Sequence, residues 1–83
     1  MHVPFFDLRV TDTALRNELV DSVEGVLKHG RILLGPEVTE FEEKVAQTAG
    51  TKYAIGFSSG SSALYLALRC LDIGPGDEVI TTP

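Results

Sequence analysis

The first half of the chain carries two runs of apolar positions at helical spacing. In the first run the apolar residues recur every three or four positions, as on one face of a helix: Leu15, Leu19, Val20, Val23, Val26 and Leu27. A polar N-cap is available at Thr11, Asp12 or Thr13, and Gly30 stands where a left-handed residue can end a helix. The pattern predicts an amphipathic helix over about 12–29.

A second helix is predicted to follow a short apolar connector. Pro36 suits the first position of this helix, and Gly50 suits its end. Its inner face is a stripe of apolar residues: Val38, Phe41, Val45 and Ala49. Its early turns, where the helix dipole favours negative charge, carry several glutamates: Glu37, Glu40, Glu42 and Glu43. Carboxylates spread around several helix faces are usually solvated, so we expect no metal site there.

The second half of the chain alternates between strand and helix patterns. Residues 52–57 form a short β-type run, a turn rich in glycine and serine follows, and residues 63–71 form an almost uninterrupted apolar helix. After a further turn, residues 78–82 are the next strand candidate. A helix that is apolar on most sides is expected to be buried. The order strand, helix, strand predicts the opening unit of an α/β sheet.

Composition and charge narrow the class of protein. With 83 residues the chain makes at most one small domain, and 7 Lys+Arg against 12 Asp+Glu give a net charge of −5. Without a basic stripe, nucleic acid and anionic membranes are not expected as partners. No apolar run approaches the roughly 20 residues of a spanning helix. The first residues lack the pattern of a signal peptide, and Cys70 has no second cysteine to pair with, so we expect a cytoplasmic protein.

The turn before the apolar helix is a candidate anion site. A strand that turns directly into a helix leaves unpaired backbone N–H groups at the positive end of the helix dipole. Gly60 permits close approach to the backbone, and Ser61 and Ser62 can donate from both the backbone and the hydroxyl. Serine is also an ordinary N-cap and Gly-Ser an ordinary turn, so the local pattern supports the two interpretations about equally.

Other catalytic motifs are absent or incomplete. Neither the P-loop pattern nor the Gly-x-Gly-x-x-Gly fingerprint occurs, which disfavours ATP and NAD sites. Residues 56–60 match the Gly-x-Ser-x-Gly elbow of hydrolases, with Ser58 as the nucleophile. Both histidines of the chain precede Ser58, however, whereas the hydrolase triad runs serine, acid, histidine. We therefore disfavour a hydrolase, and we interpret His29 as a cap at the end of its helix.

Four blocks of the sequence together resemble one known family. They occur in the family's order and cover almost the whole chain: 4–8 (PFFDL), 29–38 (HGRILLGPEV) with Phe41 and Glu42, 59–64 (SGSSAL) and 76–83 (GDEVITTP). The resemblance is to the N-terminal part of the DegT/DnrJ/EryC1/StrS sugar aminotransferases. It implies an α/β fold like that of aspartate aminotransferase, the type I fold of pyridoxal-phosphate enzymes. In that fold, N-terminal helices precede the first strand-helix-strand unit of the large domain.

The resemblance also implies an activity and a cofactor. The family uses pyridoxal 5'-phosphate to move an amino group from glutamate or a similar amino acid to a keto group of a nucleotide-linked sugar, and its active site is shared across a homodimer. The turn that receives the cofactor's phosphate falls on Gly60, Ser61 and Ser62, with serine where threonine is commoner. The connector 30–35 resembles the segment near the substrate, which makes Arg31 a candidate substrate contact, with a plain surface arginine as the alternative.

We expect residues 1–83 to be an N-terminal fragment of the large, cofactor-binding domain. Residues 1–51 then supply the N-terminal segment and two helices, and residues 52–83 begin the sheet. The family's lysine that carries the cofactor belongs to a later segment. The chain is therefore expected to hold no catalytic residue and to be inactive without the rest of its polypeptide. A pyridoxal-phosphate-dependent sugar dehydratase of the same fold and a non-catalytic interaction module are the alternatives.

Overall fold

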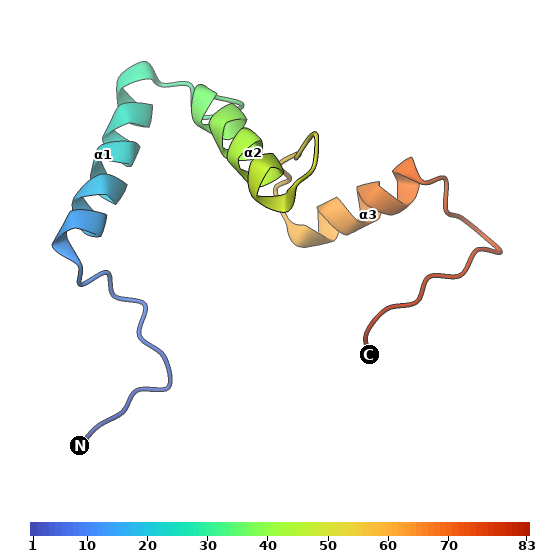
Figure 1. Cartoon of the computed structure of the whole chain (residues 1–83), viewed down its shortest axis with the longest axis horizontal. Helices are drawn as coiled ribbons and strands as arrows, with labels where there is room; N and C mark the ends of the chain where they lie inside the picture. The colour runs from blue at the N-terminus through green and yellow to red at the C-terminus, as the bar shows by residue number, and fades with distance from the viewer. The chain divides into compact units, whose positions relative to one another are not determined.

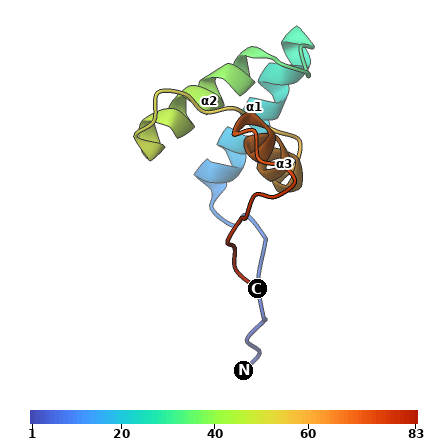
Figure 2. The ribbon, with the colours of Figure 1, turned by 90° about the vertical axis from the view of Figure 1, so that its right-hand side faces the viewer.

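The computed structural model describes residues 1–83 and contains three helices, α1 (Thr13–His29), α2 (Pro36–Ala49) and α3 (Gly60–Cys70), as Figure 1 shows. The turned view in Figure 2 shows the same helices joined by loops, without a strand. The chain divides into two compact units, Met1–Glu40 and Phe41–Pro83. None of the helices combines the length and the apolar character needed to cross a membrane.

Helix α1 begins and ends at the residues that its sequence pattern predicts. Asp12 is the N-cap, and its carboxylate accepts the N–H of Leu15 at 2.7 Å. At the other end Gly30 has a left-handed backbone (φ 71°), and its N–H donates to the carbonyl of Val26 at 2.8 Å. The predicted helix over about 12–29 is thus confirmed, and its caps explain both boundaries.

Helix α2 likewise starts at Pro36, with Glu37 in its first turn. It ends at Ala49 before Gly50, which has a φ of 69°. The following N–H, of Thr51, donates back to the carbonyl of Ala46 at 3.0 Å, which satisfies one of the carbonyls that a helix end leaves unpaired. Ala46 is also the one apolar side chain that is buried. The second predicted helix is confirmed, but most of its apolar stripe is exposed.

Helix α3 starts earlier than the apolar run that predicts it, because Ser59 takes the N-cap position. The prediction that this helix is buried is wrong for this chain, since none of its residues is buried. Leu64 and Tyr65 are 72% and 63% exposed, and Cys70 is exposed as well. Burial of an all-apolar helix needs a surface to pack against, and the unit Phe41–Pro83 supplies none.

The two predicted strands are the main correction to the expected α/β fold. Residues 52–57 and 78–82 lie outside any strand, so the strand-helix-strand unit is not formed. A strand is defined by hydrogen bonds to a neighbouring strand, and neither segment has such a partner here. The helical part of the expected architecture is present, and the sheet is not.

The exposure of these helix faces predicts how the 83-residue chain behaves alone. An isolated helix of fewer than about 12 to 15 residues is marginal in water, and tertiary packing normally supplies the missing stability. We expect circular dichroism of the purified chain to show partial helicity that is lost gradually on heating. A single cooperative melting transition at low protein concentration would contradict this expectation.

Candidate functional site

The start of α3 is organised by two hydrogen bonds between serines. Ser59 is extended (φ −156°, ψ 158°), and its Oγ accepts the N–H of Ser62 at 3.1 Å. The Ser59 hydroxyl in turn donates to Oγ of Ser62 at 3.0 Å. The carbonyl of Ser59 accepts the N–H of Ala63 at 3.1 Å, which is the first hydrogen bond of the helix ladder. Ser59 is therefore the N-cap of α3, and the N-terminal end of the helix remains exposed to solvent.

This cap decides which donors remain for a ligand. The N–H groups of Gly60 and Ser61 donate to no protein acceptor, whereas the N–H of Ser62 is already bonded to Ser59. A Cβ placed on Gly60 would meet nothing within 4 Å, so the space beside Gly60 is open. Because Ser59 donates to Oγ of Ser62, the hydroxyl proton of Ser62 can serve another acceptor. Amides and hydroxyls at the positive end of a helix are a suitable set for an anion.

The three predicted anion-binding residues lie where the sequence predicts, but only two of their backbone amides are free for a ligand. Gly60, Ser61 and Ser62 lie together in the first turn of α3, as the sequence predicts. Of the three backbone amides, however, the amide of Ser62 is taken by the cap. The sequence carries the signal for this, since a serine three residues before another N–H donor is the usual N-cap spacing.

A second polar contact secures the segment that leads into this turn. Oε1 of Glu42, on α2, accepts the backbone N–H of Gly56 at 2.7 Å. A Cβ on Gly56 would lie 3.3 Å from the same oxygen, so a larger residue would crowd the contact. Sequence analysis missed this role and placed Glu42 among the solvated glutamates. The two partners are 14 positions apart, and no local pattern connects them.

The connector 30–35, which carries Arg31, belongs to the unit Met1–Glu40. Its backbone is held by a hydrogen bond to the side chain of His29. Nε2 of His29 lies 2.7 Å from Oε1 of Glu37, and Nδ1 of His29 accepts the N–H of Arg31 at 3.0 Å. A Cβ on Gly35 would lie 2.3 Å from the carbonyl oxygen of Arg31, so only glycine fits there. The ring of His29 was expected to cap α1, but it instead links the last residue of α1 to the connector and to the first turn of α2.

The contact with His29 changes the acidity of Glu37. The hydrogen bond from the imidazole is the largest cause that holds the pKa of the Glu37 carboxyl below its usual value. The backbone N–H of Glu37 and the positive charge of Arg31 act in the same direction. Glu37 is therefore ionised at neutral pH and able to accept a hydrogen bond.

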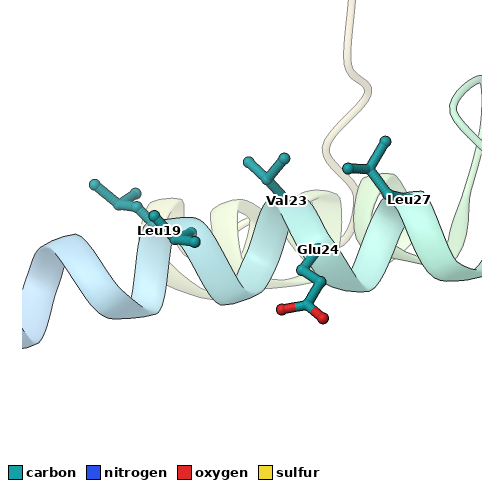
Figure 3. Close-up of a pocket in the computed structure, with 5 residues that line it drawn as sticks. Leu19, Val23, Glu24 and Leu27 are labelled. Carbon is teal, nitrogen blue, oxygen red and sulfur yellow. The ribbon is translucent and has the colours of Figure 1, made fainter.

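A hollow along α1 is not a candidate site for a polar ligand. It is lined by apolar side chains and one carboxylate: Leu19, Val20, Val23, Glu24 and Leu27. Figure 3 shows Leu19, Val23 and Leu27 on one side of the helix and the carboxylate of Glu24 turned away from them. The hollow is an exposed helix face without donors for an anion. No group of three or more His, Cys, Asp or Glu side chains gathers as a metal site would require.

Comparison with known proteins identifies a family that covers most of the chain. Residues 13–83 match the model of the DegT/DnrJ/EryC1/StrS aminotransferase family. The chain belongs to this family. The candidate anion site at the start of α3 and the connector with Arg31 both lie within the matched residues.

Several curated relatives are enzymes of sugar metabolism by name. The dTDP-3-amino-3,4,6-trideoxy-alpha-D-glucose transaminase of Streptomyces venezuelae is 51% identical over 78 residues, which are 94% of this chain and 21% of that protein. The UDP-2-acetamido-2-deoxy-3-oxo-D-glucuronate aminotransferase of Pseudomonas aeruginosa is 40% identical over 79 residues, 95% of this chain and 22% of that protein.

A further relative has a different kind of name. The "Pleiotropic regulatory protein" of Geobacillus stearothermophilus is 38% identical over 82 residues, 99% of this chain and 22% of that protein. The chain thus spans about a fifth of the length of the curated relatives it matches. No solved structure matches the chain.

The contact between Glu42 and Gly56 can be tested by amide hydrogen exchange. Replacing Glu42 by alanine removes the acceptor of the Gly56 N–H, and a hydrogen bond to a charged group is worth roughly 1.5 to 3 kcal/mol. We expect the Gly56 amide to exchange about tenfold faster in Glu42→Ala. This factor corresponds to the low end of that energy range, because the contact is exposed to solvent. Glu43→Ala is the matched control. Equal exchange at Gly56 in the parent and Glu42→Ala would show that the contact is not formed.

The acidity of Glu37 gives a pH prediction. Because the folded pKa of Glu37 is lowered, the link to His29 is at full strength above the ordinary glutamate pKa and is lost as pH falls through the lowered value. We expect His29→Ala to move the pKa of Glu37 up toward its usual value. A carbon-13 NMR titration of the Glu37 carboxyl in the parent and in His29→Ala measures this pKa. Coincident titration curves would show that the hydrogen bond with His29 does not lower the pKa of Glu37.

Proposed function

We propose that this chain supplies part of the phosphate site of a pyridoxal-phosphate-dependent aminotransferase that acts on nucleotide-linked sugars. The observation that carries the proposal is the open first turn of α3, with the free amides of Gly60 and Ser61. Membership of an aminotransferase family and the names of the sugar-nucleotide relatives support the reaction class. The activity of the whole protein is inferred from these two lines together.

The residues at the start of α3 fit the phosphate of pyridoxal 5'-phosphate. A phosphate monoester brings a charge near −2 and three acceptor oxygens at neutral pH. The backbone amides of Gly60 and Ser61 and the hydroxyls of Ser61 and Ser62 are donors of the right kind, at the positive end of the helix dipole. When bound, the cofactor supplies the electron sink for amino transfer. The work of this chain is to hold and orient the phosphate end.

Arg31 is the proposed contact to the sugar nucleotide. The Arg31 residue is exposed on a connector with a defined backbone, which leaves the guanidinium accessible. A guanidinium can bind phosphate oxygens through paired N–H donors, and a nucleotide-linked sugar carries a diphosphate. We place Arg31 at that diphosphate and assign the amino donor as glutamate.

The apolar N-terminal segment supports a homodimer. Phe5 is 100% exposed and Leu8 is 84% exposed, and burial of such side chains would remove apolar surface from water. We propose that a second subunit of a cytoplasmic homodimer covers this segment.

A non-catalytic regulatory role is the second candidate. It is favoured by one observation, the relative that is named a pleiotropic regulatory protein and matches nearly the whole chain. An intact protein that binds pyridoxal phosphate but transfers no amino group to any sugar nucleotide would favour this role over catalysis.

The phosphate site is tested by replacing both hydroxyls in the full-length enzyme. Each hydroxyl bonded to a charged group is worth roughly 1.5 to 3 kcal/mol. We therefore expect cofactor affinity to fall by one to several orders of magnitude in the double variant Ser61→Ala/Ser62→Ala, measured by equilibrium titration. Ser58→Ala, in the same turn but before the cap, is the control and should bind as the parent does. Unchanged affinity in the double variant would contradict the assignment.

A further inference from the structure

Both ring nitrogens of His29 are engaged by different groups. Nδ1 lies 3.0 Å from the backbone nitrogen of Arg31, and a backbone N–H can only donate. Nδ1 must therefore carry no proton in this arrangement. The remaining ring proton sits on Nε2, which donates to Oε1 of Glu37 at 2.7 Å. The two contacts together fix one neutral tautomer of the imidazole.

The same contacts hold the backbone of Arg31 from two sides. The N–H of Arg31 is bound by His29, and its carbonyl oxygen is packed so closely against Gly35 that a Cβ there would lie at 2.3 Å. Gly35 is buried and its carbonyl accepts the N–H of Val38 at 3.1 Å, which joins this end of the connector to α2. The backbone at Arg31 is thus defined, while the Arg31 residue is exposed.

We propose that His29 is a positioning residue for substrate binding. As the neutral tautomer with its proton on Nε2, it links Glu37 to the backbone of Arg31 and so fixes the point from which the guanidinium reaches the diphosphate of a nucleotide-linked sugar. This inference rests on the proposed function of Arg31. A preformed connector loses less conformational freedom when the ligand binds, which is how a residue without ligand contact raises affinity.

The arrangement has a defined response to acid. A proton on Nδ1 removes the acceptor for the N–H of Arg31, whereas the Nε2 contact with Glu37 persists in the imidazolium. The charged groups around the ring are the Glu37 carboxylate, in contact with it, and the Arg31 guanidinium, whose charge acts on Glu37. Lys28, the residue before His29, is paired with Glu24. Protonation of His29 therefore releases the backbone of Arg31 and weakens substrate binding.

Two variants separate the two ring contacts in the full-length enzyme. The amide of asparagine can replace the acceptor at Nδ1, and the longer amide of glutamine can replace the donor at Nε2. We expect His29→Ala to raise KM for the nucleotide sugar roughly tenfold, the size of one lost contact with a charged group, and to leave kcat within about twofold. His29→Asn should restore part of the loss, and His29→Gln should not. KM for the amino donor should not change in any of them, and His2→Ala serves as the control.

A double-mutant cycle with Arg31 distinguishes failure of this inference from failure of the proposed function. If Arg31→Ala leaves KM for the nucleotide sugar unchanged, the proposed role of Arg31 is wrong. If Arg31→Ala raises KM but His29→Ala does not, or if the two effects are independent and add, the positioning role of His29 is wrong. Our expectation is that His29→Ala adds little once Arg31 is alanine, because it acts through that residue.

A spectroscopic measurement keeps the inference testable if a variant does not fold. Nitrogen-15 NMR of the enzyme labelled at histidine reports which ring nitrogen carries the proton. We expect the neutral ring of His29 to show a protonated Nε2 and an unprotonated Nδ1. On lowering the pH, KM for the nucleotide sugar should rise as Nδ1 gains its proton. Protonation of Nδ1 in the neutral ring, or a KM that does not follow this titration, would overturn the proposal.

Discussion

The hydroxyl of Ser59 controls what the candidate phosphate site can offer. By accepting the N–H of Ser62, it satisfies one of the amides that a helix start leaves unpaired and directs the remaining two, of Gly60 and Ser61, toward solvent. Without this cap the first turn of α3 would fray, and the amides would have no common direction. The position of the anion site therefore depends on a residue that we do not expect to touch the ligand through its side chain.

Two glutamates of α2 play comparable roles in the two units. Glu37 binds the imidazole of His29 and so fixes the connector that carries Arg31, and Glu42 binds the amide of Gly56 in the segment before the candidate phosphate turn. Each uses a carboxylate on a helix to fix a loop that has no regular structure. The loops that carry the candidate site residues are thus held by polar contacts, because neither unit has an apolar core that could hold them.

The sequence predicts the features that depend on near neighbours. The limits of α1 and α2 follow from Asp12, Gly30, Pro36 and Gly50, since caps and helix stops act within one turn. Gly60, Ser61 and Ser62 are located by the same local logic, and the family follows from the order of the motifs. The cap at Ser59 also has a local signal, although sequence analysis did not assign it.

Features that depend on residues far apart in the sequence could not be predicted from local patterns. The segments 52–57 and 78–82 have the composition of strands but no partner to pair with, and the apolar α3 has no surface to cover it. The contact between Glu42 and Gly56 joins residues that no periodic pattern relates. His29 was expected to cap α1, whereas its ring binds groups on the connector and on α2.

The central claim is that the free amides at the start of α3 bind the cofactor's phosphate. The most direct measurement follows the backbone amides of the full-length enzyme by nitrogen-15 NMR while pyridoxal phosphate is added to the cofactor-free protein. We expect large downfield proton shifts at Gly60 and Ser61, and only a small change at Ser62, whose N–H is already bonded to Ser59. Stoichiometric cofactor binding with no shift at Gly60 and Ser61 would contradict the account.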